Sequence, residues 1–265
     1  MASRPSGLIA TQGIELLTFG TPNGHKVSIL LEELKSEYGL QYTFQSIDIS
    51  QNIQKEPWFV ALNPNGRIPV IVDHDNGGLA VFEGSAILSY LTRRYDKQNK
   101  FSFAIEDNEY TVAESWIGWQ HGGLGPMQGQ ANHFLRSAPE TIPYAMQRYV
   151  GEVERLYGIL DKRLTDRDYI AGNVRGRYSI ADISLLGWVN FLGLIPVTLN
   201  QFPAVQKWWD RCYKRPAVKA GINVPSQAFL SPEKELTAEE QEKRASLRDM
   251  VQQAKSSYGY KYKSP

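Results

Sequence analysis

The stretch "TFGTPNGHKVSILLEEL" (residues 18–34) joins the end of a predicted strand, a Pro-Asn-Gly turn and an amphipathic helix. The turn places Thr21 and Asn23 at the positive, N-terminal end of that helix, where an anion is stabilised. Since the turn contains no cysteine, serine or tyrosine, it offers a site for an anion but no nucleophile of its own. Apolar residues recur at the helical spacing i, i+3, i+4 and i+7, namely Val27, Leu30, Leu31 and Leu34.

The segments around this helix predict a thioredoxin-like domain. A short irregular helix is expected around residues 57–62, and a longer helix over residues 85–95. Strands are expected at residues 14–19, 41–49, 68–73 and 79–82. The resulting order, β-α-β, a short helix, then β-β-α, is the order of the thioredoxin fold.

The second half of the chain predicts an all-helical domain. One face of a long helix is traced by Tyr149, Val153, Leu156, Tyr157, Leu160 and Leu164. Residues 178–192 are apolar nearly all round, which indicates a buried central helix. Ser179 and Asp182 have the spacing of a capping box at its start, so we assign them to folding rather than to chemistry.

These patterns divide the chain into five parts. We expect a disordered lead-in (1–13), a thioredoxin-like domain (14–96), a linker (97–108), a helical domain (109–226) and a charged extension (227–265). Within the extension, a solvent-facing helix starting near Thr237 is the simpler reading, and a regulatory or docking tail is the alternative.

Composition limits the classes of function. The 265 residues carry 29 Lys+Arg against 28 Asp+Glu, which argues against a bulk electrostatic grip on nucleic acid or acidic membranes. No signal peptide and no apolar run of about 18 residues is visible, so we expect a soluble, cytoplasmic protein. The single cysteine, Cys212, excludes a disulfide framework, and the scattered histidines indicate no metal site. "GLGPMQG" (123–129) lacks the spacing and the preceding strand of a dinucleotide site.

Pro69 stands at the head of a predicted strand, where proline is unusual because it cannot donate to the ladder. A cis bond between Ile68 and Pro69 would turn the backbone and leave the N–H and C=O of Ile68 free to pair with an extended peptide. The alternative is an ordinary proline on an edge strand.

A strand runs straight into a helix in "VFEGSAIL" (81–88). The free amides at this junction, around Gly84 and Ser85, can bind a carboxylate, and Glu83 can pair with an ammonium. Together they would hold the α-amino acid end of a ligand. The alternative is that Glu83 and Ser85 only cap the helix.

Six segments together resemble the cytosolic glutathione transferases, in particular the fungal class named after the yeast nitrogen-catabolite repressor and prion protein, and the bacterial nu class. They are "TPNGHKVSILLEEL" (21–34), "NPNGRIPVIVD" (63–73), "FEGSAIL" (82–88), "WIGWQHGGLGPMQGQANHF" (116–134), "YSIADISLL" (178–186) and "KRPAV" (214–218). The resemblance covers residues 14–222 and implies a thioredoxin-like domain followed by an all-α domain.

The resemblance also implies that glutathione, a tripeptide with its own thiol, is the co-substrate, with no metal and no nucleotide, and that the protein is a homodimer. Asn23, and Thr21 beside it, would hold the thiolate. The implied contacts of glutathione are Gln54, Arg67, Ile68, Pro69, Glu83, Gly84 and Ser85. The family pattern Glu-Ser-x-Ala-Ile is here Glu-Gly-Ser-Ala-Ile, so the hydroxyl has moved by one residue.

Without an active-site cysteine, no glutathionyl-enzyme intermediate is expected. The thiolate would attack an electrophilic carbon or reduce a small disulfide by thiol–disulfide exchange, and the resemblance favours disulfide reduction. The second substrate would bind between the domains, near Trp119, His121, Met127 and His133, although such side chains are more often core. The competing functions are a regulatory protein and a ligandin-like carrier on the same fold.

Overall fold

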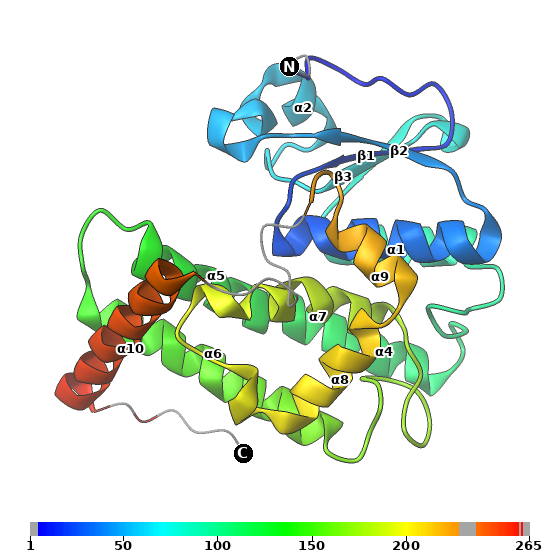
Figure 1. The fold of residues 1–265 in the computed structure, drawn as a ribbon. Helices are drawn as coiled ribbons and strands as arrows, with labels where there is room; N and C mark the ends of the chain where they lie inside the picture. Colours follow the sequence, from blue (N-terminus) through cyan, green and yellow to red (C-terminus); the bar gives the residue numbers. More distant parts are fainter. Residues whose placement is uncertain (1–4, 228–236, 260, 262–265) are drawn as a thin grey trace.

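The structure is a computed structural model of the chain, and it describes residues 5–227, 237–259 and 261. A mixed α/β domain comes first, and a helical domain follows it; helix α1 (Pro22–Tyr38) lies where the two meet (Figure 1). No helix within the described ranges has both the length and the apolar character needed to span a membrane.

The first domain is built on a four-stranded sheet in the order β2-β1-β3-β4. Strand β2 runs parallel to β1, whereas β3 is antiparallel to both β1 and β4. The strands are β1 (Ile14–Thr18), β2 (Tyr42–Ser46), β3 (Val70–Asp73) and β4 (Leu79–Phe82). The helical elements between and after them are α1, η1 (Ile49–Gln51), η2 (Ile53–Lys55), α2 (Pro57–Leu62), η3 (His74–Asn76) and α3 (Gly84–Tyr95). The predicted thioredoxin-like fold is confirmed.

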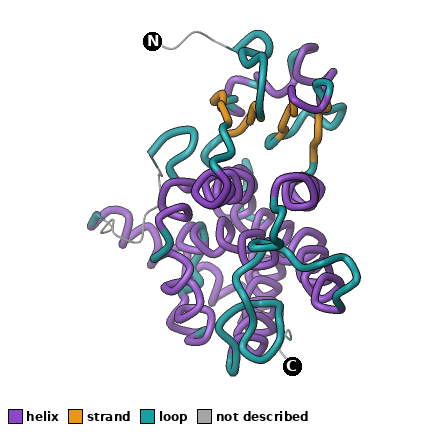
Figure 2. The backbone as a smooth tube through the Cα atoms, turned by 90° about the vertical axis from the view of Figure 1, so that its right-hand side faces the viewer, coloured by secondary structure: helices purple, strands orange, loops and turns teal. Residues whose placement is uncertain are grey.

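The sheet separates two hydrophobic clusters because successive side chains of a strand point to opposite faces. Leu16 of β1 belongs to the main core, together with Val27 of α1. Leu17, its neighbour, packs with Phe59 of α2 in a smaller cluster. Helices α1 and α2 accordingly cover opposite faces of the sheet (Figure 1), and in Figure 2 the strands form one layer in the upper part of the molecule, with helical segments above and below it.

The second domain is helical, as expected. Its longer elements are α4 (Asn108–Trp119), the π-helix η4 (Gln120–Leu124), α5 (Gly125–Arg136), α6 (Pro143–Leu164), α7 (Ile180–Asn190), α8 (Pro203–Tyr213), α9 (Pro216–Ile222) and α10 (Ala238–Tyr258). Two short 3-10 turns, η5 (Leu192–Leu194) and η6 (Leu199–Gln201), connect α7 to α8. Elements α4, η4 and α5 follow one another without a loop.

Helix α7 is the buried centre of this domain, and the predicted capping box is confirmed. The Asp182 carboxylate accepts hydrogen bonds from the Ser179 amide (3.0 Å), the Ile170 amide (3.0 Å) and the Trp208 indole (2.7 Å). Complete burial raises the pKa of Asp182 to about 6 in spite of these donors. Besides closing the capping box, the carboxylate therefore ties two other segments, at Ile170 and at Trp208 of α8, to the start of α7.

Two glycines let α1 lie directly against the second domain. A Cβ on Gly187 of α7 would stand 2.3 Å from the Pro22 carbonyl oxygen, and a Cβ on Gly221 of α9 would stand 2.5 Å from the Cα of Ile29. An ion pair between Glu33 and Arg215 (Oε1–Nε 2.6 Å) also links α1 to the start of α9, nearer the C-terminal end of α1. The N-terminus of α1 is thus held by backbone contact with the helical domain.

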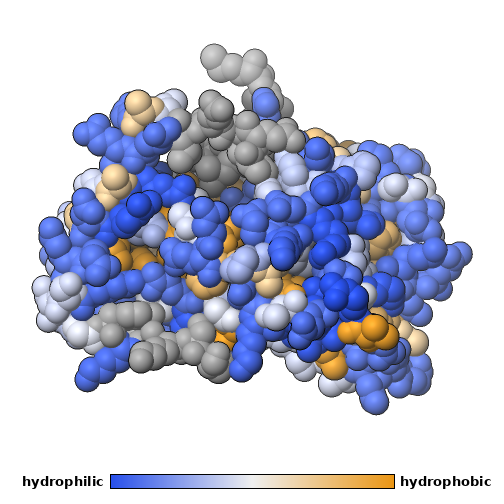
Figure 3. Space-filling model, turned by 60° about the horizontal axis from the view of Figure 1, so that its bottom comes forward, coloured by the Kyte–Doolittle hydropathy of each residue, from blue (hydrophilic) through white to orange (hydrophobic). Residues whose placement is uncertain are grey.

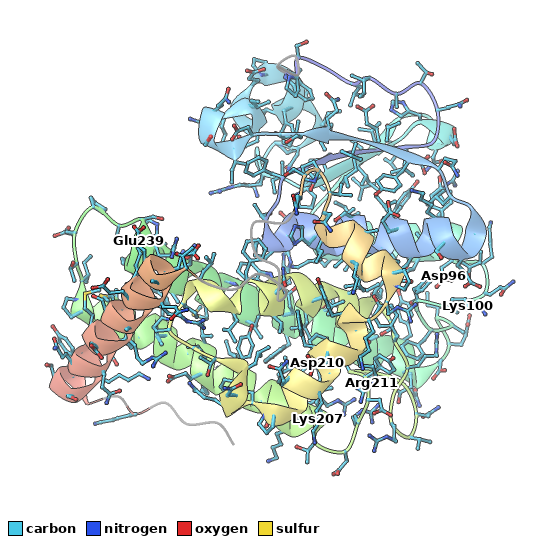
Figure 4. The ribbon with its side chains drawn as sticks, in the orientation of Figure 1. Asp96, Lys100, Lys207, Asp210, Arg211 and Glu239 are labelled. Atoms are coloured by element: carbon cyan, nitrogen blue, oxygen red, sulfur yellow. The ribbon has the colours of Figure 1, made fainter. Side chains whose placement is uncertain are left out.

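Buried carboxylates bind the segments at both edges of the first domain. The amides of Ile9 and Ala10, in the predicted lead-in, donate to the Glu15 carboxylate (both 2.9 Å); residues 1–4 lie outside the described residues. Asp96, the last residue before the predicted linker, accepts from the amides of Lys100 (2.8 Å) and Phe101 (2.7 Å), and Asp96 and Lys100 lie beside each other in Figure 4.

The charged extension contains the expected helix, α10, whose capping residue is Thr237. Residues 228–236 of the extension lie outside the described residues. The helix packs on α6, where the Lys255 ammonium pairs with Glu154 (2.6 Å). The face shown in Figure 3 is mostly hydrophilic, with apolar side chains exposed only in small patches.

Candidate functional site

A pocket of about 580 Å³ opens where the two domains meet. The first domain lines it with the start of α1, the η1–η2 segment, the loop before β3 and the junction between β4 and α3. The second domain lines it with η4, α5 and α7. The predicted site residues that line it are Thr21, Asn23, Gln54, Arg67, Ile68, Pro69, Glu83, Gly84 and His121.

The start of α1 presents Asn23 to the pocket. Thr21 is the N-cap, and its Oγ1 accepts a hydrogen bond from the Gly24 amide (3.2 Å). Asn23 is the second residue of the helix and is exposed, and the residue that caps the helix is Thr21 rather than Asn23. Only glycine fits next, because a Cβ on Gly24 would lie 2.2 Å from the Phe19 carbonyl oxygen.

The loop before β3 presents backbone groups. The Ile68–Pro69 bond is cis, as predicted, and it precedes the first residue of β3. The buried Asn63 holds the loop, since its side-chain amide donates to the Arg67 carbonyl (2.7 Å) and its oxygen accepts from the Asn65 amide (3.0 Å). Ile68 therefore lies on the pocket wall in a fixed backbone geometry.

The junction between β4 and α3 is strained. Glu83 has φ 68° and ψ 120°, a conformation that a residue with a side chain rarely adopts. No side chain caps α3, which argues against a mere capping role for Glu83 and Ser85 and leaves the first amides of the helix for another acceptor. Gly84 lines the pocket, whereas Ser85, one residue further on, does not. Backbone strain of this kind clusters at binding sites.

Several buried polar atoms of the pocket lack a partner among the described residues. Gln54 is 6% exposed, and its Oε1 makes no such hydrogen bond. The same holds for Nε2 of Gln120 and Nε1 of Trp188, on the wall formed by the second domain. Buried polar groups are normally paired with protein, water or a ligand, so these three atoms have hydrogen-bonding capacity left for a water molecule or a polar ligand.

The second-domain wall differs from the prediction. Of the four residues assigned to the second substrate, only His121 lines the pocket, with its Nε2 3.3 Å from the Glu83 carboxylate. Trp119 and Met127 pack on the hydrophobic core, and the exposed His133 stands edge-on to Phe134. The wall is formed by other residues of η4, α5 and α7, namely Gln120, Gly125, Pro126, Gly129, Gln130 and Trp188.

Lys26 is a pocket residue that the sequence did not reveal. It lies one helical turn after Asn23 and is only 2% exposed. Its ammonium donates to the Gln120 Oε1 (2.8 Å), across the boundary between the domains. Burial lowers the pKa of Lys26 to about 7, although the Glu83 carboxylate acts in the opposite direction.

The lining contains no cysteine, serine or tyrosine among the described residues. Cys212 is buried in α8, and burial raises the pKa of its thiol well above the usual value. No group of three or more metal-ligating side chains is found in the part of the chain that the structure describes. The described lining therefore offers no thiol, and disulfide exchange at this site would need a thiol that a ligand brings.

Comparison with known proteins identifies the family. The model of the glutathione S-transferase N-terminal domain matches residues 13–93, and that of the C-terminal domain matches residues 138–216. The disulfide-bond oxidoreductase YfcG of Escherichia coli (strain K12) is 42% identical over 208 residues, which cover 77% of this chain and 92% of that protein.

Solved structures of related proteins point to the same family. A glutathione transferase homologue from Lodderomyces elongisporus, with two GSH per subunit, superposes with a TM-score of 0.76 at 43% identity, covering 81% of this chain and 99% of the other. Ure2p in complex with glutathione gives a TM-score of 0.74 at 31% identity, covering 81% and 96%.

The fold is thus that of a glutathione transferase, and the chain belongs to the glutathione transferase family. Its relatives include the Ure2 proteins, so the resemblance to the fungal class named after the yeast repressor is confirmed.

Proposed function

We propose that this protein binds glutathione in the pocket and uses its thiolate to reduce small disulfides and, to a lesser degree, to attack electrophilic carbon. One observation carries the proposal. The start of α1, the peptide edge at Ile68 and the Glu83–Gly84 junction line a single cavity, although they are far apart in sequence. Each of them suits a different part of the tripeptide.

The γ-glutamyl end of glutathione belongs at the start of α3. Its carboxylate would accept hydrogen bonds from the Gly84 amide, and its ammonium would pair with the Glu83 carboxylate. The cysteinyl backbone would pair with Ile68 as a short extra strand. The free Oε1 of Gln54 would accept from the peptide backbone, and Arg67 would face the glycyl carboxylate. This arrangement leaves the sulfur beside Asn23.

Asn23 and the helix dipole are sufficient to form the thiolate. A free thiol has a pKa of about 8.5, and a useful thiolate at neutral pH needs a decrease of about two units, or ~2.7 kcal/mol. A helix N-terminus contributes ~0.3–1 kcal/mol, and a hydrogen bond to a charged acceptor contributes ~1.5–3 kcal/mol. The amide of Asn23, with the Thr21 hydroxyl nearby, therefore needs no general base.

Disulfide reduction then follows by direct exchange. The bound thiolate attacks one sulfur of the disulfide, a new sulfur–sulfur bond forms, and the other sulfur leaves as a thiolate. The likeness to YfcG, which is named a disulfide-bond oxidoreductase, supports this chemistry. Solved relatives that hold glutathione support the choice of co-substrate. We also expect a homodimer, as the family likeness implies, and sedimentation velocity tests that expectation.

The test combines calorimetric titration with glutathione and turnover of a small mixed disulfide, followed through glutathione reductase and NADPH. A chloronitrobenzene serves as the electrophilic carbon substrate in parallel. We expect micromolar-to-millimolar binding and faster disulfide reduction than conjugation. Binding without turnover of either substrate would refute the enzyme and leave a regulatory or carrier protein, and no binding would refute the site.

A further inference from the structure

Lys26 lies at the point where the two halves of the pocket meet. It follows Asn23 by three residues, so the two side chains are neighbours on one face of α1. Its stem passes beneath the start of α3, where a Cβ on Gly84 would lie 3.6 Å from the Lys26 Cδ. Its ammonium reaches the second domain, 2.8 Å from the Gln120 Oε1 and 5.9 Å from the centre of the Trp188 ring.

The side chain is therefore held by both domains, its stem by the start of α3 and its ammonium by Gln120 and Trp188, at the boundary between the proposed glutathione half and the second-substrate half. A lysine that only served solubility would extend into water instead, because an ammonium is costly to bury. The structure holds this one among Gln120, Trp188 and the start of α3, with 2% of the residue exposed. Lys26 has no role in the reaction proposed above.

The charged groups that share the pocket with Lys26 are Arg67, Glu83 and His121. Glu83 is the one that raises the pKa of Lys26, and burial, the larger effect, lowers it to about 7. On α1 itself, burial lowers the pKa of the adjacent His25 to about 4, so this imidazole is neutral at pH 7. Lys26 can consequently gain and lose its proton near neutral pH, which a solvent-exposed lysine cannot.

We propose that Lys26 is the general acid that protonates the sulfur leaving from the disulfide. The inference rests on the proposed function, because it assigns a residue to the second step of that reaction. The glutathione thiolate attacks the near sulfur, a new sulfur–sulfur bond to glutathione forms as the original one breaks, and the departing thiolate takes a proton from the Lys26 ammonium. The neutral amine keeps its contact with Gln120 and regains a proton from water.

The direction of this transfer is favourable. The leaving thiolate of an alkyl thiol, with a conjugate-acid pKa of about 8.5, is a stronger base than an amine whose own pKa is about 7. Asn23, which stabilises the attacking sulfur, has no proton to give at this pH. The two neighbouring residues of α1 would thus serve the two sulfurs of the reaction.

The experiment compares two mixed disulfides of glutathione that differ only in the leaving thiol. One releases an alkyl thiol, and the other releases a nitro-aromatic thiol that is stable as a thiolate and needs no proton. The kcat/KM of each is measured for the wild type, Lys26→Met and Lys26→Arg. Lys35→Met is the matched control, since Lys35 is an exposed lysine of the same helix outside the pocket lining.

We expect Lys26→Met to lower kcat/KM for the alkyl disulfide by ~100-fold or more, in the range of general acid catalysis, and for the aromatic one by less than ~3-fold. Lys26→Arg should not restore the alkyl reaction, because guanidinium keeps its proton. Equal losses on the two substrates, or recovery with arginine, would overturn the general acid.

A second readout uses the wild type alone and does not depend on the folding of a variant. The ratio of the alkyl to the aromatic rate should fall as pH rises through the pKa of Lys26, and a flat ratio would overturn the inference. Glutathione titration and thermal unfolding are recorded for every variant. If the wild type reduces neither disulfide, the proposed function itself fails. If the wild type reduces both and substitution of Lys26 leaves the ratio of the two rates unchanged, only the general acid fails.

Discussion

The two walls of the pocket are built from different parts of the chain. The first domain contributes the ends of elements: the start of α1, the peptide before β3 and the start of α3. The second domain contributes side chains from within continuous helical segments, among them Gln120 and Trp188. Ends of elements offer unpaired backbone groups, which suit an invariant peptide such as glutathione. Side chains on helices can change without disturbing the backbone, which suits a second substrate that varies.

The contact between the start of α1 and the second domain, called the joint below, is as important for the site as the two walls. Helix α1 belongs to the first domain, yet its start touches α7 through backbone atoms of Pro22 and Gly187. The position of Asn23 therefore depends on the second domain, although its chemistry serves the first wall. The following variants test the contributions of the joint, the first wall and the second wall separately.

The largest effect is expected for Gly187→Ala, which acts on the joint. The new methyl would stand 2.3 Å from the Pro22 carbonyl oxygen, and backbone cannot move aside as a side chain can. We expect a loss of about 3 kcal/mol of unfolding free energy, at the upper end of overpacking effects, together with weaker glutathione binding. Denaturant unfolding measures it. Gly118→Ala on α4 is the control: nothing lies within 4 Å of its Cβ position, and its stability should be equal or higher.

A pH effect of similar size is expected from His25, which packs against Phe191 at the same joint. Burial lowers its pKa from 6.5 to about 4, so the unfolded chain binds the proton more tightly than the folded one. Stability should therefore fall as pH decreases from about 6.5 to 4, by up to about 3 kcal/mol. In His25→Phe this part of the loss should disappear. If the variant loses as much stability as the wild type over that range, His25 does not carry the effect.

The first wall is tested by Glu83→Gln, which removes the charge that would pair with the glutathione ammonium. We expect the Kd for glutathione to rise by ~10–100-fold, because a hydrogen bond between charged groups contributes ~1.5–3 kcal/mol. Calorimetric titration gives the value. Glu37→Gln, an exposed carboxylate on the far end of α1, should leave the Kd within about twofold. An unchanged Kd in Glu83→Gln would place the γ-glutamyl end elsewhere.

The second wall should give the smallest effect. Trp188→Phe removes the indole N–H, which has no partner among the described residues, and part of the ring. The loss of one neutral hydrogen bond to the substrate should cost about 1 kcal/mol or less of binding free energy. We expect the KM for the disulfide to rise by up to ~5-fold while the Kd for glutathione stays within about twofold. A larger change in glutathione binding than in disulfide KM would remove the distinction between the two walls.

The first wall could be predicted from the sequence because each of its parts is local. A Pro-Asn-Gly turn, a proline heading a strand and a Glu-Gly step at a strand–helix junction are visible within a few residues, and Asn23, Pro69 and Glu83 all line the pocket. At the strand–helix junction the sequence did not distinguish Gly84, which lines the pocket, from Ser85, which does not.

The second wall could not be predicted because helix packing decides it. The π-helix at Gln120–Leu124 adds a residue to one turn, so the apolar phase of α4 does not continue into α5. Trp119 and Met127, which the sequence assigned to the second-substrate pocket, pack on the core instead. Lys26 was missed for a related reason: its burial depends on Gln120, 94 residues away, and on α7.

The most direct test of the whole account is the pKa of the glutathione thiol on the protein, followed by the ultraviolet absorbance of its thiolate as pH is raised. In the wild type we expect a pKa about two units below that of free glutathione. In Asn23→Ala it should return by ~1–2 units with the Kd within about threefold, because one hydrogen bond to the sulfur is lost. The same thiol pKa in both proteins would show that Asn23 does not hold the thiolate, and the central claim would be wrong.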